Sequence, residues 1–228
     1  MTVSDLLNRR ALKKAHTNEL IRSVAQSLFL ERGFDDVTIA DVARASDVAV
    51  QTVFNHFATK EDLFFAGHTP WVEGPATAIR TRSAHMTPLA ALRTYLIGLV
   101  ETRVSDRRLE ERQRFIGVLE ASEALVIKER RLVREAESHT AAALAEAWRD
   151  QGEPAAVATA AQLTAAIWTA TIRVAVIDRR VADPTGTDPQ ATAEELCALT
   201  DPVLRQLEAC LPPVLLPAWA RTSATSAA

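Results

Sequence analysis

The chain is poor in glycine and cysteine, and both shortages exclude classes of function. It contains 7 glycines and 2 cysteines in 228 residues. Phosphate-cradling loops, dinucleotide-binding motifs and the nucleophile elbow of hydrolases need glycines at fixed spacings, and none of these patterns occurs. Cys197 and Cys210 lie too far apart along one helix to form a disulfide. They are more simply interpreted as small buried hydrophobic residues in a reducing compartment.

Metal-ligand clusters and targeting segments are lacking too. The five histidines are scattered; they form no cluster with aspartate and glutamate at metal-ligand spacing, and no two cysteines are separated by two residues. We therefore predict no catalytic residues, no metal, no cofactor and no enzyme activity. The stretch 154–172 carries no charge, but alanine, threonine and Gln162 make its transfer into lipid unfavourable. Because no charged-then-apolar leader is visible, the expected location is the cytoplasm, without a membrane partner.

The net charge is small, a formal −3 at pH 7. Affinity for nucleic acid would therefore have to come from a local patch of basic residues rather than from the protein as a whole. The sequence contains such a patch near its start, where Arg9, Arg10, Lys13 and Lys14 occur with no acidic residue between them. Each of these could simply belong to a solvated helix start.

Residues 38–57 have the pattern of two short helices joined by a tight turn. Thr38 and Asp41 form a capping-box pair at the start of the first helix. In the second helix, Val53, Phe54 and Phe57 have the spacing of an inward face. This is the geometry of a DNA-reading helix-turn-helix. The residues predicted to contact DNA from it have small, amide or other polar side chains that suit a major groove: Thr38, Ala49, Val50, Gln51, Thr52, Asn55 and His56.

Two flanking signals complete a three-helix unit. Gly33 is placed to end a preceding amphipathic helix in a left-handed cap. Thr59 and Asp62 form a second capping box, which places Lys60 in the first turn of the next helix, where its ammonium group can meet a phosphate. Beside such a unit, Arg9 and Arg10 are expected to contact phosphates or the minor groove.

This region resembles the DNA-binding domain of the TetR family of bacterial regulators from about Leu12 to Ala66. Two departures concern the turn. Asp47 stands where the family usually has glycine, and Ala49 where it often has serine, so Asp47 is expected to cap the second helix in its place. Phe54 stands where the family often has tyrosine. The resemblance rests on four linked segments: Glu31-Arg32-Gly33-Phe34, Val37 through Ala43, Thr52 through Phe57, and Thr59 through Leu63.

The remainder of the chain predicts helices only, so the fold is all-α with nine or ten helices. We expect three parts: a helix-turn-helix domain over 10–67 with its motif at 38–57, a helical effector-binding and dimerisation domain over 68–213, and a loose tail over 214–228. Within the second part we expect a loop at 68–75 and a break near 105–106. Two long helices are expected over 122–149 and 155–182. A break at 183–186 then precedes a last helix over 189–210, which Pro212-Pro213 is expected to stop.

The resemblance implies a homodimer formed through the last two long helices. Val157, Ala161, Thr164 and Trp168, with Ala165 and Thr169 beside them, form a surface that would allow close approach of a second helix. Two recognition helices in one dimer would bind a palindromic double-stranded DNA operator.

The resemblance also implies a pocket for a small-molecule effector in the second domain. For any single aromatic residue there, core packing is the simpler interpretation. Arg173, a cation in an apolar helix, could bind an anionic effector or form a salt bridge between subunits. The candidate lining residues are Trp71, Tyr95, Phe115, Trp148, Trp168 and Arg173.

Two functions from different classes remain open on the sequence alone. The first is a ligand-responsive transcriptional regulator, by family base rate a repressor that its effector releases from DNA. The alternative is a helical small-molecule enzyme or lipid-binding carrier whose N-terminal motif no longer binds DNA, for which Asp47 and Ala49 offer thin support.

Overall fold

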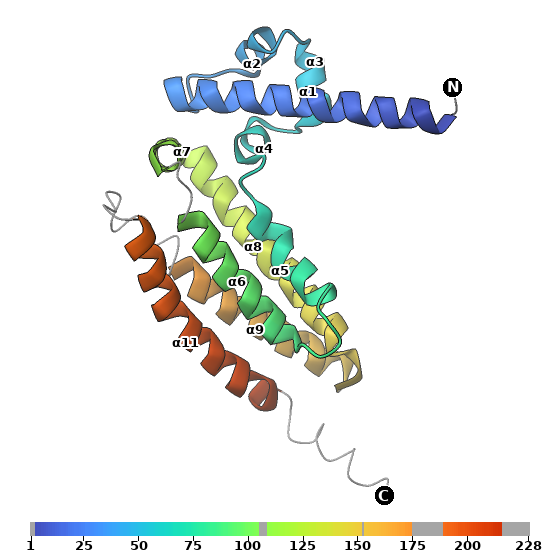
Figure 1. Ribbon diagram of the computed structural model, residues 1–228, viewed down its shortest axis with the longest axis vertical. Helices are drawn as coiled ribbons and strands as arrows, with labels where there is room; N and C mark the ends of the chain where they lie inside the picture. Colours follow the sequence, from blue (N-terminus) through green and yellow to red (C-terminus); the bar gives the residue numbers. More distant parts are fainter. Residues whose placement is uncertain (1–2, 105–108, 152, 175–188, 216–228) are drawn as a thin grey trace, which may run out of the picture. The chain divides into compact units, whose positions relative to one another are not determined.

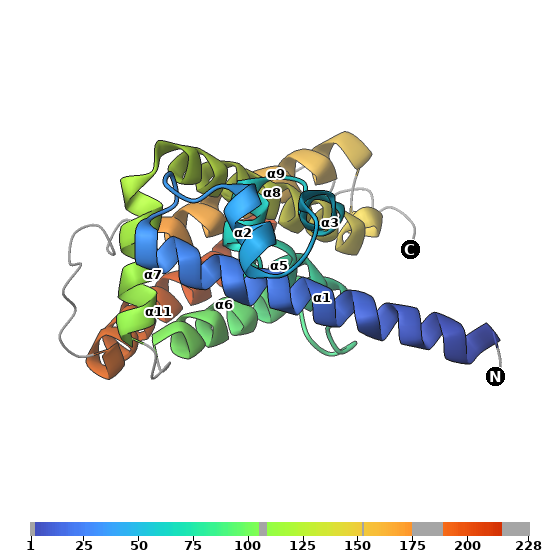
Figure 2. The same ribbon diagram turned by 90° about the horizontal axis from the view of Figure 1, so that it is seen from above.

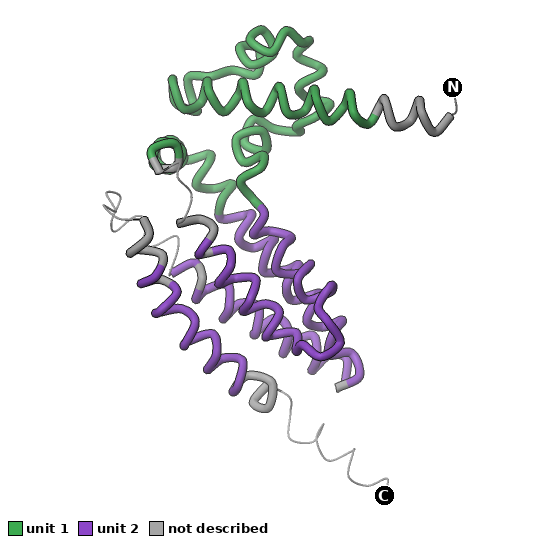
Figure 3. Tube along the Cα trace, viewed as in Figure 1, with its two compact units in different colours: residues 1–69, 110–129 green, residues 70–109, 130–228 purple. Residues whose placement is uncertain are grey.

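The computed structural model describes residues 3–104, 109–151, 153–174 and 189–215 (Figure 1). Within these ranges the chain forms ten α-helices, one short 3-10 helix and no strand, which confirms the predicted all-α class. It divides into two compact units, residues 1–69 with 110–129 and residues 70–109 with 130–228 (Figure 3). The predicted breaks near 105–106 and 183–186 lie outside the described residues, as does most of the predicted tail.

Unit 1 contains the N-terminal helices and a later segment that returns to them. Its main contacts are α1 with α2, α1 with α4 and α2 with α3; Figure 2 looks onto α2 and α3 from above. The helices of this unit are α1 (Val3–Arg32), α2 (Ile39–Ala45), α3 (Val50–His56), α4 (Lys60–Phe65), α7 (Leu109–Ala121) and the first turns of α8 (Glu123–Ala147).

The core of unit 1 is aromatic. Gly33 ends α1 with φ 85°, a conformation that glycine adopts without strain, and its amide donates to the carbonyl of Phe29 at 3.0 Å. This turn directs Phe34 inward, where its ring lies 5.3 Å from that of Phe29 and 5.8 Å from that of Phe64. Phe115 of α7 then stacks on Phe64 at 4.5 Å. The returning segment is therefore part of the same hydrophobic core.

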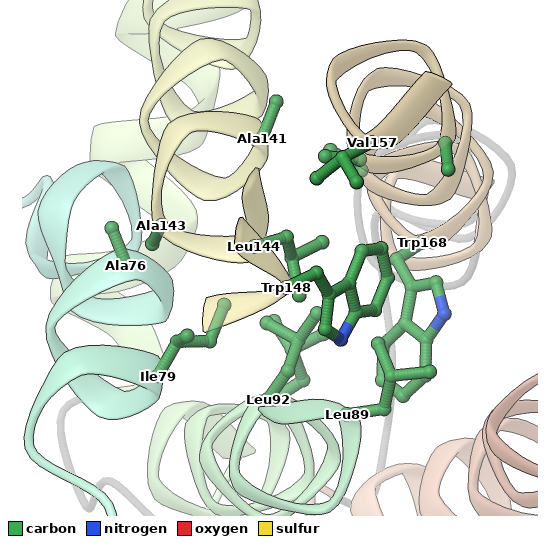
Figure 4. Close-up of a cluster of buried hydrophobic side chains, with 14 of the residues drawn as sticks. Ala76, Ile79, Leu89, Leu92, Ala141, Ala143, Leu144, Trp148, Val157 and Trp168 are labelled. Carbon is green, nitrogen blue, oxygen red and sulfur yellow. The ribbon is translucent and has the colours of Figure 1, made fainter. Parts of the chain in front are cut away.

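Unit 2 is a bundle of long helices with one buried cluster. The cluster draws on all of its helices, and the side chains of Trp148 and Trp168 both point into it (Figure 4). Arg93 of α6 donates to Asp201 and Glu208 of α11, each at 2.9 Å, and so joins these two helices. The helices are α5 (Pro70–Arg80), α6 (Pro88–Val104), most of α8, the 3-10 helix Arg149–Gln151, α9 (Pro154–Ile172) and α11 (Pro189–Leu215).

Two predicted boundaries in this unit are wrong. The predicted loop at 68–75 is helical from Pro70 onward, because proline suits a helix start and the helix continues past Pro75. The last helix does not stop at Pro212-Pro213 but runs to Leu215. Each proline lacks the N–H that would donate to the carbonyl four residues before it, yet the helix continues two residues beyond Pro213.

The surface predicted to meet a second subunit is also wrong. Val157, Ala161, Thr164 and Trp168 are between 0 and 3% exposed, because they face the core of their own unit. The exposed apolar side chains of α9 lie on a different face, at Leu163 and Ile167.

Gly74 of α5 lies against the side chain of Tyr95 in α6. The hydroxyl of Tyr95 donates to the carbonyl of Pro70 at 2.8 Å, and a Cβ added at Gly74 would lie 1.8 Å from that hydroxyl oxygen. We expect Gly74→Ala to lower the free energy of unfolding by about 1–3 kcal/mol, because the ring must move and lose its hydrogen bond. Gly98→Ala is the matched control. It meets no atom within 4 Å and should stabilise helix α6 by about 0.5–1 kcal/mol. Urea denaturation measures both, and equal stability of Gly74→Ala and the parent would contradict the close approach.

Candidate nucleic-acid interface

Helix α2 begins with the predicted capping box. Thr38 Oγ1 accepts from the amide of Asp41 at 3.2 Å, and the Asp41 carboxylate accepts from the amide of Thr38 at 3.0 Å. Hydrogen bonds from the side chain and backbone of Thr38 hold the pKa of Asp41 below its ordinary value. Val42 and Ala43 are buried beneath. Thr38 itself is exposed but already bonded to the cap.

The turn between α2 and α3 has the left-handed residue that the sequence predicts. Asp47 has φ 52°, which a short polar side chain tolerates at modest cost. The prediction that Asp47 also caps α3 is wrong. Ala49 occupies the N-cap position, and no side chain bonds to the first turn of α3. The carbonyl of Ala49 closes that turn instead, accepting from the amide of Thr52 at 2.8 Å.

Helix α3 is anchored by Val53, which is fully buried, and by Phe57 just after its end. The prediction that Phe54 shares this inward face is wrong. Its side chain is 45% exposed, because it lies one residue round the helix from Val53 and the two buried anchors already fill the contact with the rest of the unit. The exposed surface of α3 thus carries the ring of Phe54, although the spacing of Phe54 in the sequence predicts that it packs in the core.

The two amide side chains predicted to contact bases lie together on that exposed surface. Gln51 Nε2 donates to Asn55 Oδ1 at 3.2 Å, which leaves the Gln51 oxygen and the Asn55 amino group for another partner. Val50 is 43% exposed, and Ala49 is exposed as well. All four of these predicted residues are exposed, and the hydrogen bond joins two of them.

Thr52 and His56 are half-buried rather than fully outward. Nδ1 of His56 is buried and finds no hydrogen-bond partner among the described residues. Only the part of the imidazole ring away from Nδ1 is therefore available to contact another molecule.

Lys60 is already engaged within unit 1. Its ammonium group donates to the carbonyls of Phe34 and Val37 at 2.8 and 2.9 Å and lies 4.0 Å from the centre of the Phe34 ring. It thereby fixes the loop between α1 and α2. An ammonium group has three donors, so one remains beyond these two carbonyls.

The basic patch lies on α1. Arg9 and Arg10 fall within this helix, but their side chains are outside the described part of the structure. Lys13 and Lys14 are exposed.

The match to known proteins falls on this same segment. The model of the bacterial regulatory proteins of the tetR family matches residues 21–66, which span the end of α1 and all of α2, α3 and α4. Over these residues the chain matches the TetR family. The chain is 34% identical over 104 residues to the HTH-type transcriptional regulator TcmR of Streptomyces glaucescens. The aligned part makes up 46% of this chain and 45% of TcmR. The chain is 27% identical over 104 residues to the repressor BepR of Brucella suis, which covers 45% of this chain and 50% of BepR. The chain thus spans about half the length of these TetR-family relatives.

Solved structures show the same fold over more of the chain. NalD of Pseudomonas aeruginosa, a repressor of a multidrug efflux pump, superposes with a TM-score of 0.53 at 20% identity over 82% of this chain and 95% of NalD. SmeT in its complex with triclosan gives a TM-score of 0.54 at 18% identity over 82% of this chain and 91% of SmeT. At these identities the likeness is one of TetR-type fold alone.

The predicted effector residues do not form one group. Trp148 and Trp168 are 6 and 1% exposed in the core of unit 2, and Tyr95 packs against the same cluster. Trp71 is half-buried and Arg173 exposed. Phe115 belongs instead to unit 1, where it lies between Phe64 and His68. The sequence near Phe115 does not indicate that it belongs to a different unit from the other candidates, because its aromatic partners are about fifty residues away in the chain.

Two further features bear on function. No three His, Cys, Asp or Glu side chains in the described ranges lie close enough to bind a metal ion. Across the same ranges, every helix is too short or too polar to cross a bilayer.

An ion pair that the sequence did not predict holds the start of α8 to α4. Lys128 Nζ lies 2.6 Å from Asp62 Oδ1, and Asp62 also forms the capping box with Thr59. Burial raises the pKa of Asp62, but the hydrogen bonds from Lys128 and Thr59 outweigh it, so the pKa lies below the ordinary value. The charged form of Asp62 therefore stabilises unit 1.

We expect Lys128→Met to lower the free energy of unfolding by at most about 1 kcal/mol at pH 7, since both side chains are partly exposed. Because the folded pKa of Asp62 is lowered, this contribution is present above the unfolded pKa near 3.8 and is lost as the pH falls through the folded value. Urea denaturation between pH 7 and pH 3 should show the two proteins converging at the acid end. Arg114→Met, which removes a more exposed pair with Glu110, is the control and should change little. A gap that persists unchanged at low pH would contradict the role of the Asp62 charge.

Proposed function

We propose that this protein is a ligand-responsive transcriptional regulator that binds a palindromic operator as a homodimer, represses transcription there and is released by a small-molecule effector. The observation that carries the proposal is the surface of α3. It projects the coupled amides of Gln51 and Asn55 from a helix anchored by Val53. Amide side chains recognise adenine by paired hydrogen bonds in the major groove.

Dimerisation is supported by apolar surface on the last two long helices. Leu163 and Ile167 of α9 are 47 and 37% exposed and lie four residues apart. Leu199 and Val203 of α11 have the same spacing and are 54 and 48% exposed. Two stripes of this kind on helices that contact each other form a surface that a second copy could cover. The proposed dimer surface therefore uses the helices of the sequence prediction, but a different face of α9.

An effector site in unit 2 is supported by polar atoms rather than by the aromatic residues alone. Nε1 of Trp168 and Oγ1 of Thr200 are buried and have no hydrogen-bond partner among the described residues. A buried donor left without a partner costs about 1–3 kcal/mol, which a ligand oxygen could offset. The related structure of SmeT contains triclosan, a small molecule; the effector of this protein is to be identified from the purified dimer by native mass spectrometry.

The enzyme or carrier alternative makes a different prediction in a single experiment. In a gel-shift assay with DNA upstream of its own gene, a regulator gives sequence-selective retardation that weakens steeply as salt rises. A protein whose motif no longer binds DNA gives no shift with any candidate promoter at low salt.

Base recognition and phosphate contact can be separated with two variants. We expect Gln51→Ala to relax preference at one base position, with a loss of about 1–3 kcal/mol for the preferred base only. We expect Lys60→Ala to weaken binding to all sequences alike. If Lys60 contacts a phosphate, the salt dependence also becomes shallower by about one charge; if it only fixes the loop at 34–37, the slope stays the same. Fluorescence anisotropy against salt measures both variants, and equal losses for Gln51→Ala on specific and nonspecific DNA would exclude base recognition by Gln51.

The proposed dimer surface has its own test. Ile167→Glu places a charge in the apolar stripe and should convert the dimer to a monomer, with operator affinity falling at least tenfold because one half-site is lost. Gln162→Glu, a charge on the same helix at an exposed polar position, is the matched control and should stay dimeric. Analytical ultracentrifugation gives the oligomeric state, and a dimeric Ile167→Glu protein would place the interface elsewhere.

A further inference from the structure

Helix α3 has an exposed apolar pair that the assignment of Gln51 and Asn55 leaves unexplained. Val50 and Phe54 are four residues apart, so their side chains are neighbours on the helix surface. They are 43 and 45% exposed. No aspartate, glutamate, lysine or arginine occurs in α3, Val50–His56. The surface offered by this helix is therefore part amide and part hydrocarbon.

The size and composition of the pair limit what can cover it. A stable protein partner needs about 20–30 residues a side, and two apolar side chains next to two amides are far smaller than that. A phosphate would need a donor or a positive charge, which neither Val50 nor Phe54 has. The exposed hydrocarbon suits a small apolar group that lies beside hydrogen-bonding groups.

A base edge in the major groove has that composition. Thymine presents a C5-methyl group there, and apolar side chains such as phenylalanine contact it, while its partner adenine presents the N6 and N7 atoms that an amide recognises. The apolar pair lies one residue round the helix from the amide pair, Val50 beside Gln51 and Phe54 beside Asn55. Both chemistries on α3 therefore match A·T base pairs.

We propose that Phe54, supported by Val50, is a specificity-determining residue that contacts thymine methyl groups, and that each operator half-site carries A·T pairs where α3 enters the groove. This inference rests on the proposed DNA-binding function. It adds the type of base pair recognised and a residue absent from the predicted DNA contacts.

The experiment removes only the methyl group. Duplexes are first selected from a random library with the full-length protein, so that binding alone identifies the operator. Each thymine of the selected duplex is then replaced singly by deoxyuridine, which keeps base pairing and lacks the C5-methyl. We expect one or two positions in each half-site to bind about fourfold more weakly per methyl removed, at equivalent positions in the two half-sites.

Variants of the protein then assign the effect to Phe54. Phe54→Ala should bind the thymine duplex more weakly and no longer distinguish it from the deoxyuridine duplex. Phe54→Leu keeps an apolar side chain and should retain part of the difference. Met86→Ala, which removes an exposed apolar side chain in unit 2, should keep both the affinity and the difference. Circular dichroism melting establishes that each variant is folded, as expected for exposed positions.

Each remaining result overturns a defined claim. If an operator is selected but every deoxyuridine replacement leaves the affinity unchanged, the methyl contact is excluded while the regulator function stands. If Phe54→Ala loses equal affinity on thymine and deoxyuridine duplexes, the ring contacts something other than the methyl. If no sequence is enriched at any salt concentration, the proposed function itself fails, and this inference fails with it.

Discussion

The aromatic contact between Phe34 and Phe64 is the interaction on which the arrangement of α2, α3 and α4 depends. Phe34 follows the glycine that ends α1, and Phe64 lies in α4, so their edge contact at 5.8 Å joins the segments on either side of the motif. The loop that leads into α2 is held at the same place, because Lys60 binds the carbonyls on either side of it. With the start of α2 and the start of α4 fixed, the intervening α3 has little freedom to change its direction. The exposed side chains of α3 are thus positioned by contacts made outside α3 itself.

Local signals made the N-terminal half of this arrangement predictable. A capping box needs only two residues three positions apart, and the structure has both boxes, at Thr38 and Thr59, where the sequence predicts them. Likewise, the left-handed conformation of Asp47 follows from the need for a tight turn. The prediction for Phe54 is wrong because hydrophobicity alone does not distinguish an aromatic residue that packs inward from one that is kept exposed. Its neighbour Val53, about 100° away on the helix, is the residue that fills the core contact.

Long-range contacts explain the other differences. The face of α9 that carries Ala161 and Thr164 looks suitable for a second subunit, since small residues permit close helix packing. In the structure that face packs against helices of its own unit. A face that packs within its own unit and one that packs against a second subunit can be distinguished only when the positions of the neighbouring helices are known. In the same way, nothing near Phe115 in the sequence indicates that it stacks on Phe64. The ion pair of Lys128 with Asp62 joins residues 66 positions apart and is equally invisible to periodicity.

The discontinuity of unit 1 has a consequence for biosynthesis. Residues 110–129 complete a core that begins in the first 69 residues. While the ribosome has released only the N-terminal helices, the face of Phe64 that Phe115 later covers is still exposed to water. Unit 1 therefore cannot reach its final packing during synthesis until α7 has left the exit tunnel, about forty residues after α4. Domains usually fold in order as the chain emerges, but here the earliest segment must wait for a later one, and in the interval its exposed ring is a site for a chaperone or for aggregation.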